Sequence, residues 1–465
     1  MKAVYWLMSL CLICIDSFAQ DVAKKLLEST KRFELDSQMR HAIYSLYVID
    51  AKTGKVVFDK NSQIGLAPAS CQKLFTSGVA FELLGQDYRF RTTLGYRGKI
   101  ENGSITGDLL FMGTGDPTLG SWRFEDTKQE VILRKLVEKI KELKVSKINS
   151  GVYVSADDWS TQTTPDGWVW QDIGNYYGAG SDMINWRENQ YDVELSSGRI
   201  LGDKVKIVGI NPALTNVELQ SEVTGAPKET GDNAYIYLAP GSHDGIIRGT
   251  IPVEEEKFQI SGSNPNPAFQ FLSDFKKELE KNNIDVSKTI DTSNFLLLFD
   301  KPTILATIYS PSLDSINYWF LRRSINLYGE ALVKVIAYEK KGFGATDSGV
   351  AMVRDFWSQQ GIDKAAINII DGSGLSPQNR VTTNALVTVL KYAKTRPWYN
   401  SFYLSLPTYN GMKMKSGSIG GARSFAGYHV SKGGHEYIFA IIVNNYDGSS
   451  AAIVNKMYKV LDNLK

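Results

Sequence analysis

The chain contains few cysteines and histidines, three and four among its 465 residues. Two of the cysteines, Cys11 and Cys14, lie in an N-terminal stretch with a positive start, a short apolar core and a small-x-small end before Gln20. This pattern predicts a cleaved secretory signal peptide over residues 1–19. Cleavage would leave Cys71 alone, which excludes an intramolecular disulfide. The histidines form no H-E-x-x-H motif, so we expect no metal, no cofactor and no Ser-His-Asp triad.

The chain also lacks an excess of charge of one sign and a long apolar run. Its formal net charge is +2, which gives no electrostatic basis for binding nucleic acid. The N-terminal apolar run over residues 3–15 is shorter than the roughly 20 residues of a membrane-spanning helix. We therefore expect an exported protein with no nucleic-acid partner and at most peripheral membrane association. Hydrophobic residues make up 43% of the chain, enough for two or three cores.

Three short motifs are present in a fixed order and are widely separated. Ser70-Cys71-Gln72-Lys73 spells S-x-x-K, Ser324-Ile325-Asn326 spells S-x-N, and Lys415-Ser416-Gly417-Ser418 spells K-[ST]-G. Together they supply a nucleophile, a base, a proton relay and a carboxylate anchor, the signature of penicillin-recognising serine acyl-transferases. The set therefore predicts an acyl-enzyme hydrolase.

The first two motifs carry the predicted acid–base chemistry. The residues before Ser70 favour a helix start, and the helix would place Lys73 one turn on, on the same face. A serine hydroxyl is a poor nucleophile at neutral pH, so it needs a base such as a lysine whose pKa is lowered. We expect Ser324 to relay a proton between Lys73 and the leaving group, and Asn326 to bind a substrate carbonyl and hold Lys73.

The third motif is expected on a strand edge beside the nucleophile. Lys415 offers a charge, and Ser416 and Ser418 offer hydroxyls. Gly417 lets a substrate backbone lie close. This is where a terminal carboxylate would bind, and the backbone N–H groups of Ser70 and Ser418 would form the oxyanion hole.

Each motif also occurs elsewhere in the chain, in a setting that predicts no catalysis. Ser273–Lys276 lies on an amphipathic helix with a charged face, Ser315–Asn317 lies close to a helix start, and Lys52–Gly54 joins two alternating runs as a hairpin turn. Singly, the three chosen motifs would also be read as an ordinary helix, a helix cap and a strand end. Their order and surroundings favour the catalytic interpretation.

Roughly 250 residues separate Ser70 from Ser324, which implies an insertion into the catalytic domain. The inserted segment contains alternating, strand-like stretches and one strongly amphipathic helix. The expected elements there are strands near 109–112, 151–154 and 234–238 and a helix over 129–143. The flanking segments favour a mixed α/β domain with a hairpin over 43–58, a helix over 70–84, a buried strand over 437–443 and a C-terminal helix over 451–464.

Further segments accompany the motifs: Gly113–Leu119, Gly167–Asp172, Asp371–Ser376 and the long insertion after Ser70. Together they resemble the low-molecular-mass, class C penicillin-binding proteins, the type 4 D-alanyl-D-alanine carboxypeptidase/endopeptidase family. The resemblance implies an α/β fold in which a transpeptidase-like domain, with an antiparallel sheet flanked by helices, is interrupted by two smaller domains. The implied boundaries are 20–91 and 297–465 for the catalytic domain, 92–115 and 184–296 for one insert, and 116–183 for the other.

The resemblance also implies cleavage of D-Ala-D-Ala termini and of D-Ala-diaminopimelate cross-links in peptidoglycan stem peptides, β-lactams as covalent inhibitors, and a periplasmic location. Family members form a pocket for the stem-peptide side chain from an acidic and an aromatic residue five apart, here Asp172 and Tyr177. Where the family commonly carries an arginine, this chain has Pro377, and we hypothesise that Arg380 takes over that role. K-S-G in place of K-T-G keeps the hydroxyl.

Two alternatives remain open from the sequence. A β-lactamase or esterase could use the same constellation, although the insertion has no role in a compact lactamase. A non-catalytic wall-binding protein could retain the fold with a blocked site.

Overall fold

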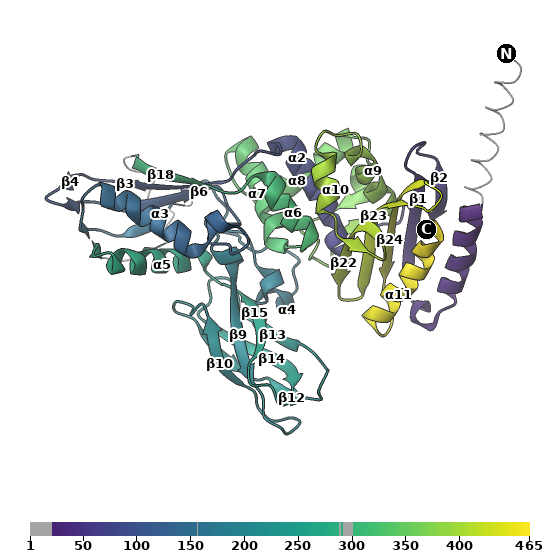
Figure 1. Cartoon of the computed structure of the whole chain (residues 1–465), viewed down its shortest axis with the longest axis horizontal. Helices are drawn as coiled ribbons and strands as arrows, with labels where there is room; N and C mark the ends of the chain where they lie inside the picture. Colours follow the sequence, from purple (N-terminus) through teal and green to yellow (C-terminus); the bar gives the residue numbers. More distant parts are fainter. Residues whose placement is uncertain (1–20, 156, 288–289, 292–300) are drawn as a thin grey trace, which may run out of the picture. The chain divides into compact units, whose positions relative to one another are not determined.

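The computed structural model describes residues 21–155, 157–287, 290–291 and 301–465 (Figure 1). The predicted signal peptide, residues 1–19, lies outside them. No helix among the described residues has the length and apolarity needed to span a bilayer. The chain divides into two compact units. Among the described residues, the first unit comprises those up to Glu82 together with Asn317–Ser324 and Val353–Lys465, and the second comprises those between Leu83 and Ile316 together with Ile325–Met352.

The first unit is built on an antiparallel sheet with the order β2-β1-β24-β23-β22-β21. Its strands are β1 (Ile43–Asp50), β2 (Val56–Lys60), β21 (Thr408–Tyr409), β22 (Met412–Ile419), β23 (Ala422–Val430) and β24 (Glu436–Asn444). The turn between β1 and β2 lies at Lys52–Gly54, as predicted, and Gly54 adopts the positive φ of +73° that glycine tolerates best. Seven consecutive residues of β24 are buried, which explains its unbroken apolar run.

Helices cover both faces of this sheet (Figure 1). The helix over residues 21–34 and α11 (Ser450–Leu461) share a core with β1, β23 and β24. On the other face, the hydroxyls of Ser45 and Thr383 lie 2.6 Å apart, and the Tyr428 hydroxyl donates to the Leu390 carbonyl at 2.8 Å, which attaches α9 (Thr383–Ala393). The remaining elements of this unit are α2 (Lys73–Leu84), α10 (Tyr399–Ser405), β19 (Ile367–Asn368) and β20 (Arg380–Val381). The chain passes between the units near the end of α2, within α6 (Leu313–Arg322), just before α7 (Asn326–Lys341) and within α8 (Thr346–Gln359).

The second unit contains several smaller sheets. Among its described residues the strand orders are β17-β8-β6-β3-β18, β16-β7-β5-β4, β10-β9-β15 and β11-β14-β12, with β13 also paired to β14. The strands of the first two are β3 (Arg91–Tyr96), β4 (Ile100–Glu101), β5 (Ser104–Ile105), β6 (Leu109–Gly113), β7 (Lys147–Ile148), β8 (Val152–Val154), β16 (Asp285–Val286), β17 (Ile290–Asp291) and β18 (Thr303–Tyr309). Those of the others are β9 (Gln190–Ser196), β10 (Lys206–Asn211), β11 (Glu218–Ser221), β12 (Thr224–Ala226), β13 (Asn233–Tyr237), β14 (Asp244–Pro252) and β15 (Phe258–Ser263).

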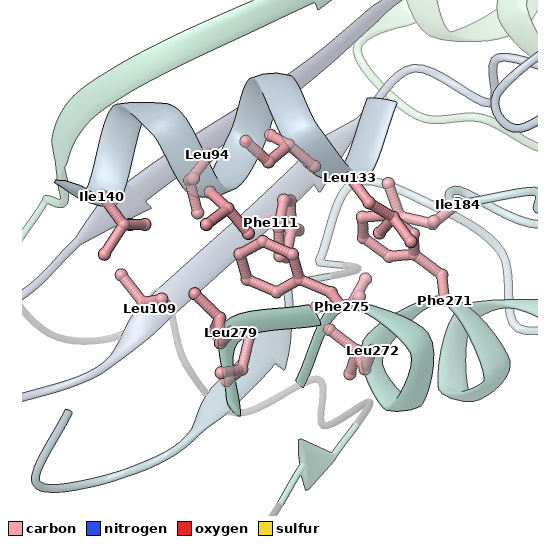
Figure 2. Packing of buried hydrophobic residues seen from close by; sticks show 14 of the residues in the cluster. Leu94, Leu109, Phe111, Leu133, Ile140, Ile184, Phe271, Leu272, Phe275 and Leu279 are labelled. Atoms are coloured by element: carbon pink, nitrogen blue, oxygen red, sulfur yellow. The ribbon is translucent and has the colours of Figure 1, made fainter. Parts of the chain in front are cut away.

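One large core of the second unit lies between α3 (Gln129–Glu142), α5 (Pro267–Lys281) and the strands β6 and β8. Figure 2 shows Phe111 of β6 facing Phe271 and Phe275 of α5, with ring centroids 4.7 and 5.1 Å apart. Leu133 and Ile140 of α3 complete the cluster (Figure 2). Both helices bury one face, as their apolar periodicity predicts.

The structure confirms the predicted mixed α/β fold and the settings of the three rejected motif copies. Lys276 forms an exposed ion pair with Glu280 at 2.6 Å on α5, and Ser315 lies in the first turn of α6. The boundaries of the two inserted domains stay a prediction.

Candidate active site

Ser70 and Lys73 lie in direct contact in the first unit. Lys73 Nζ donates to Ser70 Oγ at 2.9 Å and to the main-chain carbonyl of Ser373 at 2.7 Å. The predicted continuous helix is replaced by a 3₁₀ turn, η2 (Ala69–Gln72), and α2 begins only at Lys73. A 3₁₀ turn stacks residues three apart on one another, which aligns the two side chains. Lys73 is fully buried and Ser70 is partly exposed, so the hydroxyl forms the reachable end of the pair.

The carbonyl of Ser373 is a functional group that sequence reasoning missed. It belongs to a turn organised by the buried carboxylate of Asp371, which accepts several hydrogen bonds. The donors include Gln72 Nε2 at 2.7 Å, Gly374 N at 2.8 Å, Ser376 N at 2.8 Å and Asn379 Nδ2 at 2.9 Å. The signal was present in the D-G-S-G-L-S run, but the contact is made by a main-chain atom, which no residue type marks.

The third motif lies on β22, as predicted, and contacts the serine of the second motif. Lys415 Nζ donates to Ser324 Oγ at 2.9 Å and to the Ser416 carbonyl at 2.8 Å. Lys415 is 1% exposed, and burial lowers the pKa of its ammonium to about 8. Ser324 has φ +58°, a left-handed conformation that costs a non-glycine residue energy and is held by its surroundings.

Gly417 brings β22 against the 3₁₀ turn that carries the nucleophile. A Cβ placed on Gly417 would lie 2.5 Å from the Pro68 carbonyl oxygen and 3.0 Å from Cys71 N. The Cys71 thiol also donates to the Lys415 carbonyl at 3.2 Å. In the described residues β21 pairs only with the start of β22, at Met412 and Lys413, which leaves the edge of the K-S-G segment without a strand neighbour there. The side chains of Ser416 and Ser418 lie on this segment, partly exposed and exposed respectively.

The other predicted site residues belong to the second unit and form a group of their own. Asn326 Nδ2 donates to the main-chain carbonyl of Tyr177 at 2.7 Å. The Tyr177 hydroxyl hydrogen-bonds to the Asp172 carboxylate, and burial raises the pKa of both groups. The structure therefore brings Asp172, Tyr177 and Asn326 together, and the first two were predicted from the sequence only through a family resemblance.

Arg380 lies at the start of β20 and is exposed. Its guanidinium donates to the carbonyls of Pro377 at 2.5 Å and Asn379 at 2.8 Å. It therefore folds back over the loop that contains Pro377.

Comparison with known proteins agrees with this geometry. Residues 26–464 match the D-Ala-D-Ala carboxypeptidase 3 (S13) family. The chain is 25% identical over 450 residues to the D-alanyl-D-alanine carboxypeptidase of Actinomadura sp. strain R39, covering 90% of this chain and 81% of that protein. It is 24% identical over 417 residues to the D-alanyl-D-alanine carboxypeptidase DacB of Haemophilus influenzae, covering 84% and 83%.

Among solved structures, penicillin binding protein 4 from Haemophilus influenzae has the same fold, with a TM-score of 0.79 at 21% identity over 94% of this chain and 98% of that one. The same protein has been solved in complex with a β-lactam, with a TM-score of 0.74 over 94% of this chain and 99% of that one. The chain therefore belongs to the S13 family of D-Ala-D-Ala carboxypeptidases, and it is a hydrolase with D-Ala-D-Ala carboxypeptidase activity.

Proposed function

We propose that this carboxypeptidase acts on peptidoglycan stem peptides through an acyl-enzyme on Ser70, and that it also cleaves cross-links as an endopeptidase. The observation that carries the proposal is the 2.9 Å hydrogen bond from the buried Nζ of Lys73 to Ser70 Oγ. A lysine kept from water next to a serine hydroxyl is the arrangement that allows an amine to act as a base near neutral pH.

In the proposed reaction, Ser70 Oγ attacks the carbonyl carbon of the penultimate D-Ala as its proton passes to Lys73. Backbone N–H groups of Ser70 and Ser418 stabilise the negative charge on the carbonyl oxygen. Ser324, whose hydroxyl is held by Lys415, relays this serine proton from Lys73 to the departing amine. Water then attacks the ester carbonyl, its hydroxyl stays on the released acid, and its proton restores the Ser70 hydroxyl. The 2.9 Å contact between Lys415 Nζ and Ser324 Oγ supports this relay.

Substrate recognition divides between the two groups of residues. Lys415 and Ser416 bind the terminal carboxylate, and Gly417 lets the peptide backbone lie against β22. Asp172 and Tyr177 bind the stem-peptide side chain, whose ammonium suits a carboxylate, and Arg380 meets the carboxylate of a diaminopimelate end. We also propose that β-lactams acylate the same serine, and that residues 1–19 direct the protein to the periplasm.

The experiment that tests this function is acylation of the wild-type protein by a penicillin, followed by intact-mass measurement and peptide mapping. One stable adduct located on Ser70, together with D-Ala release from a stem pentapeptide and splitting of cross-linked muropeptide dimers, is the expected result. Rapid penicillin turnover without a stable adduct would identify a β-lactamase instead. Muropeptide binding without D-Ala release would identify a non-catalytic binder.

The pH dependence of kcat/KM offers a separate test of Lys415 as the carboxylate anchor. Because its pKa is about 8, its charge is present below pH 8 and is lost as the pH rises above 8. For a substrate with a free C-terminal carboxylate we expect kcat/KM to fall about tenfold per pH unit above this value. The matched control is the same peptide with a C-terminal amide, whose kcat/KM should not fall in this way above pH 8. An identical fall of kcat/KM for both substrates would show that Lys415 is not the carboxylate anchor.

A further inference from the structure

Lys334 is a buried lysine in the second unit that takes no part in the proposed reaction. It lies on α7, the helix that begins at Asn326, and its side chain is 0% exposed. Its Nζ donates to the main-chain carbonyls of Gln162 at 2.6 Å and Ser181 at 2.8 Å. Burial lowers its pKa to about 8, against the opposing charges of Asp182 and Glu330. The amino group of Lys334 is therefore shielded from water, and two main-chain carbonyls accept its hydrogen bonds.

The two carbonyls bracket the segment that carries the predicted side-chain pocket. Between residues 162 and 181 the described regular structure consists of the four-residue helix α4 (Trp170–Ile173) and the 3₁₀ turn η4 (Tyr176–Gly178). Asp172 lies on the first and Tyr177 on the second. Elements this short are not stable by themselves, so the position of the segment depends on its tertiary contacts. Lys334 supplies one such contact near each end.

A third contact from the same helix reaches the middle of the segment. Asn326 Nδ2 donates to the Tyr177 carbonyl at 2.7 Å, and the side chain of that same tyrosine is hydrogen-bonded to Asp172. Tyr177 therefore touches the pocket carboxylate with its hydroxyl and the amide of the second motif with its backbone. Any shift of the Tyr177 backbone moves the acceptor that orients the Asn326 amide.

We propose that Lys334 is a positioning residue that couples the Asp172–Tyr177 pocket to Asn326. By binding the carbonyls of Gln162 and Ser181, Lys334 fixes the position of the 162–181 segment relative to α7. The pocket on that segment and the Asn326 amide on α7 are then held in a constant position relative to each other. The inference rests on the proposed function. It implies that a pocket-filling side chain raises kcat, not only affinity.

The test compares two D-Ala-D-Ala peptides in the wild type and in Lys334→Met, which keeps most of the length of the side chain and removes the donors. One peptide carries lysine next to the D-Ala pair, and the other carries alanine there. The wild type is expected to show a higher kcat for the lysine peptide. In Lys334→Met this preference in kcat falls by roughly tenfold or more, because small displacements of positioning groups are costly to catalysis. The rate for the alanine peptide falls much less.

Tyr328→Phe is the matched control on the same helix. It removes another buried hydrogen bond, from the Tyr328 hydroxyl to Glu188 Oε1 at 2.8 Å, but Glu188 lies outside the 162–181 segment. We expect it to lower the unfolding midpoint while the substrate preference stays as in the wild type. Should Lys334→Met not fold, Lys334→Gln keeps two amide hydrogens for the two carbonyls and is expected to show a smaller loss of preference.

The outcomes separate the two proposals. If Lys334→Met and Lys334→Gln lower kcat equally for both peptides, Lys334 is only structural and the coupling is wrong. If the wild type has no preference in kcat, the coupling is wrong as well. If the wild type releases D-Ala from neither peptide, the proposed function fails first, whatever Lys334 does.

Discussion

Replacing Lys73 with methionine is expected to slow acylation by roughly 10⁴- to 10⁶-fold. The reason is the contact between Nζ and Ser70 Oγ at 2.9 Å in a fully buried position. Methionine has a similar length but cannot accept the proton, so the hydroxyl loses its base. The change also leaves the Ser373 carbonyl without this donor, at a cost of about 1–3 kcal/mol in the free energy of unfolding. We therefore expect the variant to fold with a lowered midpoint.

The rate is measured with a fluorescent penicillin under single-turnover conditions. Ser70→Ala, which has no hydroxyl to acylate, sets the baseline of this measurement. The control is Lys276→Met on α5, the lysine of the rejected S-x-x-K copy, whose ion pair with Glu280 is exposed and worth only about 0.5 kcal/mol. Acylation of Lys73→Met within tenfold of the wild type would show that another group is the base.

Periodic patterns in the sequence predicted individual helices and strands well where the pattern lies within the element itself. The alternating runs around Lys52–Gly54 gave the hairpin of β1 and β2, and the apolar run of β24 indicated a strand covered on both faces. The helical spacing of apolar residues over 129–143 corresponds to α3, which ends one residue earlier, at Glu142. In each case the residues of one short segment are enough to show which faces of the strand or helix are buried.

The local conformation at the nucleophile could not be predicted in the same way. The sequence favoured a helix from Ser70, whereas Ala69 has φ +46° and a 3₁₀ turn precedes α2. Ser324 is also held at a positive φ. The intrinsic backbone preferences of alanine and serine oppose the positive φ angles at Ala69 and Ser324. These conformations therefore depend on contacts with residues far away in the chain, such as Lys415.

The sequence predicted the reactive side chains of the candidate site, but it did not predict the main-chain groups that these side chains contact. The three motifs identified Ser70, Lys73 and Lys415 by residue type and order. The Ser373 and Tyr177 carbonyls that receive Lys73 and Asn326 carry no such signal, and they lie 300 and 149 residues away along the chain. The sequence does contain a signal for Lys334, which is the single charged residue in the otherwise apolar run Ala331–Ala337 of α7.

Gly417→Ala is expected to slow acylation by about 100-fold through geometry alone. A Cβ at this position would lie 2.3 Å from Ser424 Oγ and 2.5 Å from the Pro68 carbonyl oxygen, distances that real Cβ atoms essentially never show. Pro68 precedes the 3₁₀ turn of Ser70, and a backbone oxygen cannot move aside as the end of a flexible side chain can. β22 and η2 must therefore separate, which moves Lys415 away from the nucleophile. Overpacking of this kind costs about 1–3 kcal/mol in the free energy of unfolding.

The matched control for this variant is Gly420→Ala, which lies on the same hairpin, between β22 and β23. A Cβ there has no atom within 4 Å, so both the acylation rate and the unfolding midpoint should stay close to those of the wild type. Measuring both quantities for both variants separates misplacement of the site from loss of folded protein, because the rate is taken per folded molecule. Equal acylation rates for the two variants would mean that contact between Gly417 and the turn of Ser70 does not set the geometry of the nucleophile.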